Sequence, residues 1–191
     1  MRTNLERRTA LLDAAIEVLA RDGARGLTFR AVDAEAGTPV GTASNYFANR
    51  DDLLIQSSHR VYERWLPDQA TQAAAAQGPR DQAKLTELMR EIIERVTGFR
   101  SGYLAMLELR LEATRRPELR TVLTNRVRAD VDANVAYHLD QGMPGDATSV
   151  RLLILALNWL MVEMLTLPEL FTPEELDELV VAAVERGLAP R

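Results

Sequence analysis

The chain has 191 residues, of which 47% are hydrophobic and 27% are charged, so its composition is that of an ordinary globular protein and excludes a disordered or fibrous one. It has no cysteine, which excludes a disulfide framework and a thiolate zinc site, and only two histidines, His59 and His138. The net charge is −5, but residues 1–50 carry seven arginines against six carboxylates, so the acidic excess lies in residues 51–191. The N-terminal part is therefore the part that could meet a polyanion.

The chain shows no signal for export or for a membrane. Charges are spread through its first fifteen residues, without the apolar core of a signal peptide. The longest apolar run, from Leu152 to Val162, is about half the length that a membrane span needs. We therefore expect a cytoplasmic protein that does not contact a membrane.

The first two predicted helices lie within residues 3–37. The first carries apolar residues at helical spacing between Leu5 and Ala20, and Gly23 ends it. Thr28 is placed to cap a short second helix, and Gly37 ends that one.

The third predicted helix, residues 38–47, is unusual because most of its residues are small and polar. Thr38 can cap it, with Pro39 at the first helical position, where the missing N–H costs nothing. A helix here places Val40, Ala43 and Phe47 on one side. The short hydrogen-bonding groups share the other side with one aromatic hydroxyl: Thr42, Asn45 and Tyr46. Such groups suit a groove lined with phosphates and base edges, although composition alone also allows a capped loop.

Helices are also predicted throughout the remaining residues. Asn49 caps a fourth helix, with Asp52 completing a capping box, and further helices follow at about 81–96, 103–116, 118–141 and 149–167. Residues 149–167 are apolar nearly all round, so we expect one face against the core and the other against a second subunit. Thr172 and Glu175 open the final helix as a capping box. The fold class is therefore all-α.

Residues 11–54 resemble the N-terminal DNA-binding domain of the TetR family of bacterial regulators. The residues that carry the resemblance are Ala14, Ala15, Leu19, Gly23, Gly26, Leu27, Thr28, Ala36, Gly37, Gly41, Thr42, Tyr46, Phe47, Arg50, Leu53 and Leu54. The resemblance implies a three-helix helix-turn-helix head, here residues 1–50, and an all-helical effector-binding and dimerisation body, here residues 51–191. It also implies a homodimer. The chain has Pro39, Val40 and Ser44 where Ser, Lys and Tyr are common in the family.

Nine residues of the head are the candidates for contact with double-stranded DNA. Those expected to meet phosphates are Thr28, Arg30, Ser44, Tyr46 and Arg50. Those expected to meet base edges are Thr38, Val40, Thr42 and Asn45, of which Asn45 best suits adenine.

A small-molecule effector is expected to bind in the body, in a mostly apolar pocket with a few polar groups. The candidates for its wall are Tyr62, Trp65, Met89, Phe99, Tyr103, Met106, Leu107, Arg110, Tyr137, Asn158, Trp159, Met161 and Glu163. The aromatic residues among them could equally be core residues. The last two helices supply the expected dimer interface: Leu153, Leu157, Leu160, Met164, Leu176, Leu179, Val180, Ala183 and Val184.

The sequence has no Gly-rich phosphate loop, no nucleophile elbow and no metal-ligand spacing. We therefore expect no catalytic residue, no metal and no cofactor, and predict that the chain is not an enzyme. The predicted function is a dimeric, ligand-responsive transcriptional repressor that a small molecule releases from a palindromic operator. The alternative is a helical small-molecule-binding protein or enzyme without DNA binding, and a third hypothesis is an adapter that binds proteins through its apolar helix.

Overall fold

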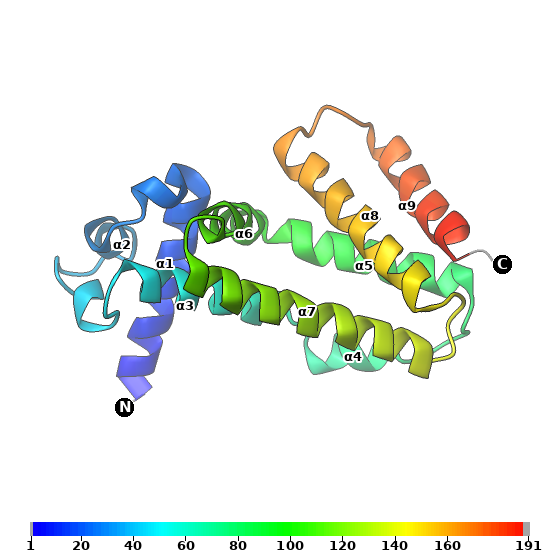
Figure 1. The fold of residues 1–191 in the computed structure, drawn as a ribbon, viewed down its shortest axis with the longest axis horizontal. Coiled ribbons are helices and arrows are strands. Elements are labelled where there is room, and N and C mark those ends of the chain that lie inside the picture. The colour runs from blue at the N-terminus through cyan, green and yellow to red at the C-terminus, as the bar shows by residue number, and fades with distance from the viewer. Residues whose placement is uncertain (1, 189–191) are drawn as a thin grey trace. The chain divides into compact units, whose positions relative to one another are not determined.

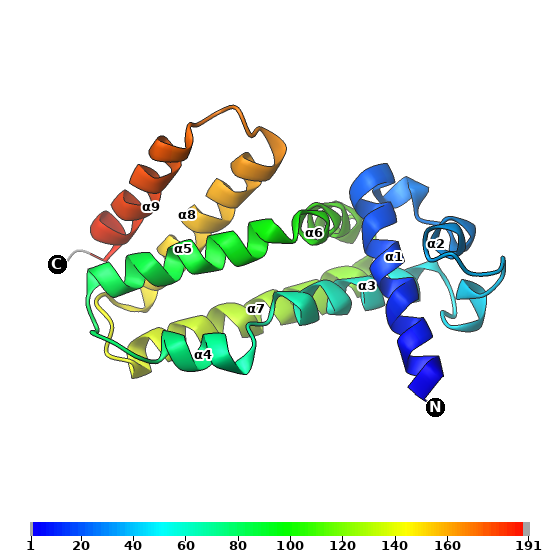
Figure 2. The ribbon, with the colours of Figure 1, turned by 180° about the vertical axis from the view of Figure 1, so that it is seen from behind.

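The computed structural model describes residues 2–188, which are helical without any strand (Figures 1 and 2). The all-α fold predicted from the sequence is confirmed. In chain order the elements are α1 (Arg2–Gly26), α2 (Phe29–Glu35), the short 3-10 helix η1 (Ala43–Asn45), α3 (Arg50–Trp65), α4 (Gln69–Ala75), α5 (Gln82–Gly98), α6 (Arg100–Ala113), α7 (Pro117–Asp140), α8 (Ala147–Thr166) and α9 (Pro173–Gly187).

The chain divides into two compact units. Unit 1 consists of Met1–Leu66 and Phe99–Arg126, and unit 2 consists of Pro67–Gly98 and Val127–Arg191. Unit 1 therefore joins the N-terminal helices to α6 and to the first turns of α7, which come much later in the sequence. The domain boundary that we expected at residue 50 stays a prediction.

Helix α1 is the centre of unit 1 and packs against α2, α3 and α6. Its side chains Leu11, Ala15, Ile16, Val18 and Leu19 are completely buried, as their helical spacing predicts. A single hydrophobic cluster holds these residues together with buried residues of α2, α3, α6 and α7. The N-terminal helices thus have a well-packed core of their own.

Gly23 was predicted to end the first helix, but it is a kink within α1, which continues to Gly26, and this kink lies against α6. Gly23 has φ +69°, a left-handed conformation that favours glycine. A Cβ atom at this position would lie 3.2 Å from a carboxylate oxygen of Glu108. That oxygen accepts a hydrogen bond from the Ala24 N–H at 2.9 Å. The glycine therefore gives α6 close access to the backbone at the end of α1.

Three predicted helix caps are present. The Thr28 hydroxyl accepts from the Ala31 N–H at 3.1 Å, and the Asn49 side chain accepts from the Asp52 N–H at 2.9 Å. The Asp52 carboxylate, however, accepts from the N–H of Ala48, so the reciprocal bond of a capping box is displaced by one residue. Thr172 and Glu175 form a complete capping box at the start of α9.

In unit 2, helices α5, α8 and α9 pack against one another. Helices α8 and α9 run antiparallel side by side (Figures 1 and 2). An ion pair between Arg90 and Asp177, 2.6 Å long, links α5 to α9. His138 is buried and its Nε2 lies 2.7 Å from the Pro144 carbonyl oxygen, which makes it a packing residue at the turn after α7.

Helix α8 is buried on one face only. Leu153, Leu157 and Leu160 are buried within unit 2, whereas Leu152, Leu155 and Trp159 are 58%, 66% and 65% exposed. By length and composition it is the one helix of residues 2–188 that could cross a membrane, and 28% of its apolar window is buried. Most of its apolar surface is thus left uncovered by this chain.

Candidate nucleic-acid interface and ligand-binding regions

The segment 38–47 is not the α-helix that its sequence predicts. It forms a turn followed by the three-residue 3-10 helix η1, Ala43–Asn45. Gly41 has φ +94°, which no right-handed helix accommodates, so a helix capped by Thr38 cannot continue through it. Val40 is 79% exposed while Ala43 and Phe47 are buried, so these three residues do not share a face. The helical prediction for this segment was wrong, and we call residues 38–47 the recognition turn.

Asp33 on α2 is the residue that shapes the recognition turn. Its side chain is 1% exposed, and its two oxygens accept from the backbone N–H groups of Gly41 and Ala43, both at 2.7 Å. The Thr38 hydroxyl donates to the Asp33 carbonyl oxygen at 3.3 Å. A buried carboxylate is stable only when such donors satisfy it. The backbone N–H groups that bind Asp33 are therefore held in a turn and cannot join a continuous helix.

Arg8 and Phe47 attach the far end of the recognition turn to the rest of unit 1. The Phe47 ring is buried in the core, and the Arg8 guanidinium lies 5.4 Å from its centroid. Arg8 also donates to the Gln56 side chain on α3 and to the Tyr46 carbonyl oxygen at 3.5 Å. Neither Asp33 nor Arg8 was a predicted site residue. The sequence feature that could have indicated Asp33 is its position directly after Val32, on the inward face of α2.

Five of the nine predicted DNA-contacting residues are exposed to solvent: Thr28, Arg30, Val40, Ser44 and Asn45. No hydrogen bond within the described residues engages the side chains of Asn45 and Arg30, whereas the Thr28 hydroxyl caps α2. Amide and guanidinium groups without internal partners are the ones that can bind a base edge or a phosphate directly.

The hydroxyl groups of Thr38, Thr42 and Ser44 donate hydrogen bonds to backbone carbonyl oxygens of the recognition turn or of α2. Thr42 donates to the Pro39 carbonyl oxygen, and Ser44 donates to the Gly41 carbonyl oxygen at 2.8 Å. Thr38 donates to Asp33. Because a phosphate oxygen needs a donor, these three hydroxyls can donate to a phosphate only by giving up these hydrogen bonds. Their DNA contacts stay a prediction.

The remaining two candidates, Tyr46 and Arg50, are partly buried. Tyr46 packs against the core of unit 1. Arg50 donates to the carbonyl oxygen of Leu27 at 3.2 Å and to that of Ala24, so it ties the start of α3 to the turn before α2. Its remaining guanidinium nitrogen lies 3.9 Å from Glu112. Arg50 thus holds the scaffold of the recognition turn together.

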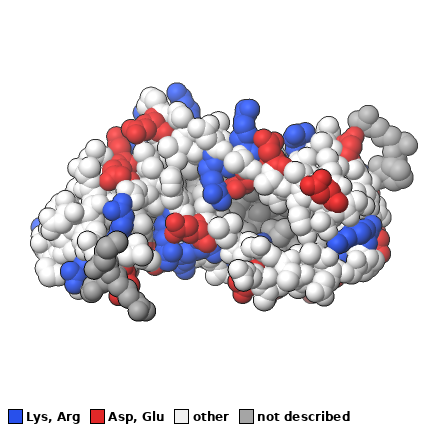
Figure 3. Space-filling view, turned by 90° about the horizontal axis from the view of Figure 1, so that it is seen from below, with Lys and Arg blue, Asp and Glu red and all other residues white. Residues whose placement is uncertain are grey.

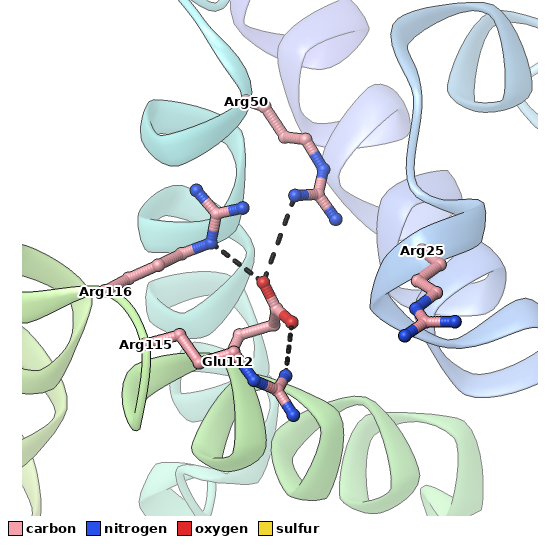
Figure 4. A pocket seen from close by; sticks show the side chains of 5 residues that line it. All are labelled: Arg25, Arg50, Glu112, Arg115 and Arg116. Carbon is pink, nitrogen blue, oxygen red and sulfur yellow. Dashed lines mark hydrogen bonds and ion pairs between the residues drawn. The ribbon is translucent and has the colours of Figure 1, made fainter.

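Arg50 also lines a hollow of about 400 Å³ in unit 1 (Figure 4). The five lining residues are Arg25, Arg50, Glu112, Arg115 and Arg116. We call this hollow the arginine pocket. No prediction from the sequence included it, because its residues come from the end of α1, the start of α3 and the end of α6.

Glu112 is the centre of the arginine pocket. Its carboxylate lies 2.8 Å from Nε of Arg116, 3.1 Å from Arg115 and 3.9 Å from Arg50. The hydrogen bond from Arg116 holds the pKa of the Glu112 carboxyl below its usual value, despite partial burial. Arg25 stands apart from this cluster across the hollow (Figure 4).

Among the expected effector-binding residues, those of unit 1 are Tyr62, Trp65, Phe99, Tyr103, Met106, Leu107 and Arg110. Three of them form an aromatic cluster, with ring centroids 5.5 Å apart for Tyr62 and Trp65 and 5.9 Å apart for Trp65 and Tyr103. Burial raises the pKa of the Tyr103 phenol, so the group is neutral. The Trp65 Nε1 is buried without a hydrogen-bond partner. Such an orphan donor is costly and calls for an acceptor.

The other expected effector-binding residues belong to unit 2: Met89, Tyr137, Asn158, Trp159, Met161 and Glu163. Met161 is buried, whereas Tyr137 is 42% exposed and Trp159 is 65% exposed. The Asn158 side chain donates to the Ile154 carbonyl oxygen of its own helix at 2.8 Å. Unit 2 by itself therefore does not gather these residues into one pocket, and the predicted pocket stays a prediction.

The residues expected at the dimer interface fall into two groups. Leu153, Leu157, Leu160, Val180 and Val184 are buried within the single chain, so they have little surface left for a partner. Leu179 is 41% exposed, and the residues of intermediate exposure are Met164, Leu176 and Ala183. The other face of α8 carries the exposed side chains Leu152, Leu155 and Trp159. A face of this helix was predicted to meet a second subunit, but these three residues were not among those named for the interface.

Charged groups of both signs are interspersed on the surface drawn in Figure 3. Acidic and basic side chains lie close together there, between larger areas of other residues. This arrangement agrees with the small net charge of −5. On this face, affinity for a polyanion would have to come from single basic groups, because no broad basic area is present there.

Comparisons with known proteins match both parts of the chain. Residues 11–56 match the family model described as bacterial regulatory proteins, tetR family, and residues 80–189 match that of the tetracyclin repressor-like C-terminal domain. The chain is 26% identical over 132 residues, 68% of its length, to the HTH-type transcriptional regulator BetI of Agrobacterium fabrum. It spans between 35% and 63% of the length of the curated relatives that it matches.

Two solved structures resemble nearly the whole chain. A TetR family member from Streptomyces coelicolor A3 has 29% identity and a TM-score of 0.72, with 97% of this chain and 99% of that chain covered. The multidrug binding protein EbrR, solved in complex with ethidium, has 28% identity and a TM-score of 0.71, with 96% of this chain and 99% of that one covered.

Proposed function

Because the chain belongs to the TetR family of bacterial regulators, we propose that it represses transcription as a homodimer bound to a palindromic operator, and that a small molecule releases it. Regulators of this family are DNA-binding proteins, and DNA is accordingly the macromolecular partner. The finer parts of the proposal are the repressor role, the palindrome, the dimer, the effector and a cytoplasmic location, where the DNA of a bacterium lies. The single observation that carries it is the recognition turn held on the buried carboxylate of Asp33.

The proposed base-reading residues are Asn45 and Val40. Both are exposed, on a turn whose backbone is held by Asp33 and whose end is anchored by Phe47. An Asn side chain can bind adenine through two hydrogen bonds, and an apolar Val suits the methyl group of thymine. Arg30, at the start of α2, is exposed and has no ion pair within the described residues, so it is the proposed phosphate contact.

The proposed dimer interface is the exposed face of α8 that carries Leu152, Leu155 and Trp159, together with Leu179 of α9. These side chains recur at helical spacing and are apolar, which favours cover by a second copy of the same helices. The proposal moves Trp159 from the effector pocket to the interface. It also explains why a helix as apolar as α8 belongs to a DNA-binding regulator.

The proposed effector site is the aromatic cluster of Tyr62, Trp65 and Tyr103. Its rings offer flat apolar surfaces, and the buried Trp65 N–H needs an acceptor that a ligand can supply. EbrR, which is 28% identical, was solved with ethidium, a planar aromatic molecule. We therefore propose a planar, largely apolar effector with a hydrogen-bond acceptor at its edge.

Binding to the DNA upstream of the chain's own coding region tests the proposed function. Fluorescence anisotropy with a labelled fragment should show tight binding that weakens steeply as salt is raised, because phosphate neutralisation releases counterions. Asn45→Ala should weaken binding by about tenfold or more, the value of one bidentate base contact of about 1–3 kcal/mol.

Asn134→Ala is the matched control, because Asn134 is exposed on α7 and bonds only to its own helix. It should bind DNA as the wild type does. An anisotropy that does not change with added DNA at low salt would contradict the proposal and would favour a small-molecule-binding protein instead. If Asn45→Ala and Asn134→Ala lost DNA affinity to the same extent, Asn45 would not be a base-reading residue.

Sedimentation tests the dimer separately. The wild type should sediment as a dimer at micromolar concentration, whereas Leu155→Asp with Trp159→Asp should sediment as a folded monomer, because two carboxylates would be desolvated at the interface. Leu139→Asp, at a 44% exposed position of α7, is the control and should leave the dimer intact. A wild-type monomer would refute the interface.

A further inference from the structure

The arginine pocket carries more positive charge than its own carboxylates balance. Four guanidinium groups line it, and Glu112 is the only acidic residue among its lining. Asp51, beside the pocket, pairs with Arg116. Four positive charges thus face two negative ones, which leaves an excess of two at the wall of a hollow of about 400 Å³. A guanidinium cannot lose its charge at physiological pH, so the excess is permanent.

The four arginines differ in how their hydrogen-bond donors are used. Arg50 and Arg116 already have several partners: Arg50 donates to two backbone carbonyls, and Arg116 donates to Glu112 and Asp51. Arg115 has a side chain that is 70% exposed and a single partner, Glu112. Arg25 is exposed, and no hydrogen bond or ion pair within the described residues engages its guanidinium.

We propose that the arginine pocket binds a phosphate-class oxyanion, held by Arg25 and Arg115 beside Glu112, Arg50 and Arg116. Arg25 and Arg115 supply the donors that the structure leaves unused. A guanidinium binds two phosphate oxygens at once through parallel N–H groups, which gives both affinity and orientation. A phosphate dianion also matches the excess of two charges.

Glu112 explains why the pocket is stable without a ligand. Its carboxylate accepts from Arg115 and Arg116 and so reduces the repulsion among four like charges. The ligand would share Arg115 with Glu112, so the internal carboxylate weakens binding. The Glu112 carboxylate therefore sets the affinity of the site, and its removal should increase that affinity.

The phosphate group could come from a small metabolite or inorganic phosphate, or from a DNA backbone. The proposal commits to the small molecule, because the four guanidinium groups line a hollow of about 400 Å³, which has room for a phosphate group. It does not depend on the proposed function, since phosphate binding can be measured without DNA.

The test is a calorimetric titration of inorganic phosphate into the full chain, with sodium chloride at matched ionic strength as the reference. The wild type should bind phosphate with saturation, and Arg25→Ala with Arg115→Ala should lose at least about tenfold in affinity, since two charge-assisted contacts disappear. Arg128→Ala, at an exposed position of α7 outside the pocket, is the matched control and should bind as the wild type does.

Glu112→Gln should increase the affinity for phosphate, whereas partial unfolding of the variant could only decrease it. This variant keeps the shape of the side chain and removes its negative charge, so phosphate should bind about tenfold more tightly. Unchanged or weaker binding in a variant with wild-type circular dichroism would overturn the role of Glu112 and with it the proposed geometry.

A second arm separates the two sources of phosphate. If the small molecule is the ligand, the double arginine variant should keep wild-type affinity for upstream DNA while losing inorganic phosphate. If inorganic phosphate does not bind but the variant loses DNA affinity and its salt slope falls by about two, the group is a backbone phosphate and the proposal is overturned. The proposal is also overturned if the wild-type protein uses these arginines to bind neither phosphate nor DNA.

Discussion

Units 1 and 2 contain similar helices but bury their apolar residues to different extents. In unit 1 the hydrophobic cluster around α1 contains many side chains that are completely buried, among them Ile16, Leu54 and Leu109. In unit 2 the most apolar helix, α8, leaves Leu155 and Trp159 about two thirds exposed. The apolar side chains named in unit 1 are buried within the single chain, whereas unit 2 exposes apolar side chains of α8 to solvent. Apolar residues at helical spacing can therefore form the core of a chain, as in α1, or leave an exposed face that suits an interface, as in α8.

The largest expected effect compares a leucine from each unit. Leu109→Ala in α6 should lower the free energy of unfolding by about 2–5 kcal/mol, because it removes a completely buried side chain and leaves a cavity. Leu155→Ala in α8 changes a side chain that is 66% exposed, so it should alter the stability of the isolated chain by about 0.5 kcal/mol or less.

Urea unfolding at several protein concentrations distinguishes the two roles. The effect of Leu155→Ala should grow as the protein concentration rises through the range of dimer formation, since association stabilises the folded state by mass action. The effect of Leu109→Ala should not depend on concentration. A large, concentration-independent loss in Leu155→Ala would mean that the α8 face is covered within the chain.

A smaller effect is expected at Asp33, where unit 1 relies on polar contacts and not on apolar packing. Asp33→Ala would leave the N–H groups of Gly41 and Ala43 without their acceptor, at a cost of about 2–3 kcal/mol. Hydrogen exchange should show loss of protection at these two amides while the amides of α1 keep theirs.

Asp140→Ala, at an exposed position at the end of α7, is the control for Asp33→Ala and should leave both amides protected. DNA affinity should fall with Asp33→Ala because the recognition turn no longer has one fixed shape. Unchanged protection at Gly41 and Ala43 would show that Asp33 does not hold the turn.

The smallest expected effect is the pH dependence of Glu112. Its pKa is lower in the folded chain than in the unfolded chain, because Arg116 stabilises the carboxylate. The ionised group therefore adds stability above the unfolded pKa of about 4.3, and this stability is lost as pH falls through the lower folded pKa. The contribution should be about 1 kcal/mol or less.

Unfolding of the wild type and of Glu112→Gln in urea measures this contribution directly. The wild type should be more stable at pH 7, and the gap should close as the pH approaches 3. Glu185→Gln, exposed on α9, should show no gap at either pH. A gap of equal size at both pH values would mean that Glu112 acts through its shape and not through its charge.

Local chemistry allowed much of the fold to be predicted. The caps at Thr28 and Asn49 and the capping box of Thr172 and Glu175 all occur where the sequence indicates, and Gly23 interrupts α1 with a kink three residues before the helix ends. Each depends on residues within three or four positions of one another, so sequence spacing alone contains the information. The buried face of α1 could also be predicted from the sequence, because its apolar residues recur with the 3.6-residue period of a helix.

The candidate sites were less predictable because their residues come from distant segments. The arginine pocket joins residues of α1, α3, α6 and the turn after α6, and no spacing pattern connects Arg25 with Arg115. The apolar run of α8 indicated that the helix is buried, but not which of its leucines the chain itself would cover. That choice was made by packing against α5 and α9.

The sequence by itself determined an all-helical chain, the ends of most of its helices and a polar segment placed for recognition between α2 and α3. Only the tertiary structure decided that this segment is a turn. A helix from Thr38 would have satisfied the local rules, but the buried carboxylate of Asp33 takes the N–H groups of Gly41 and Ala43. Since a buried charge must be satisfied by donors, this contact with α2 holds the segment in a turn.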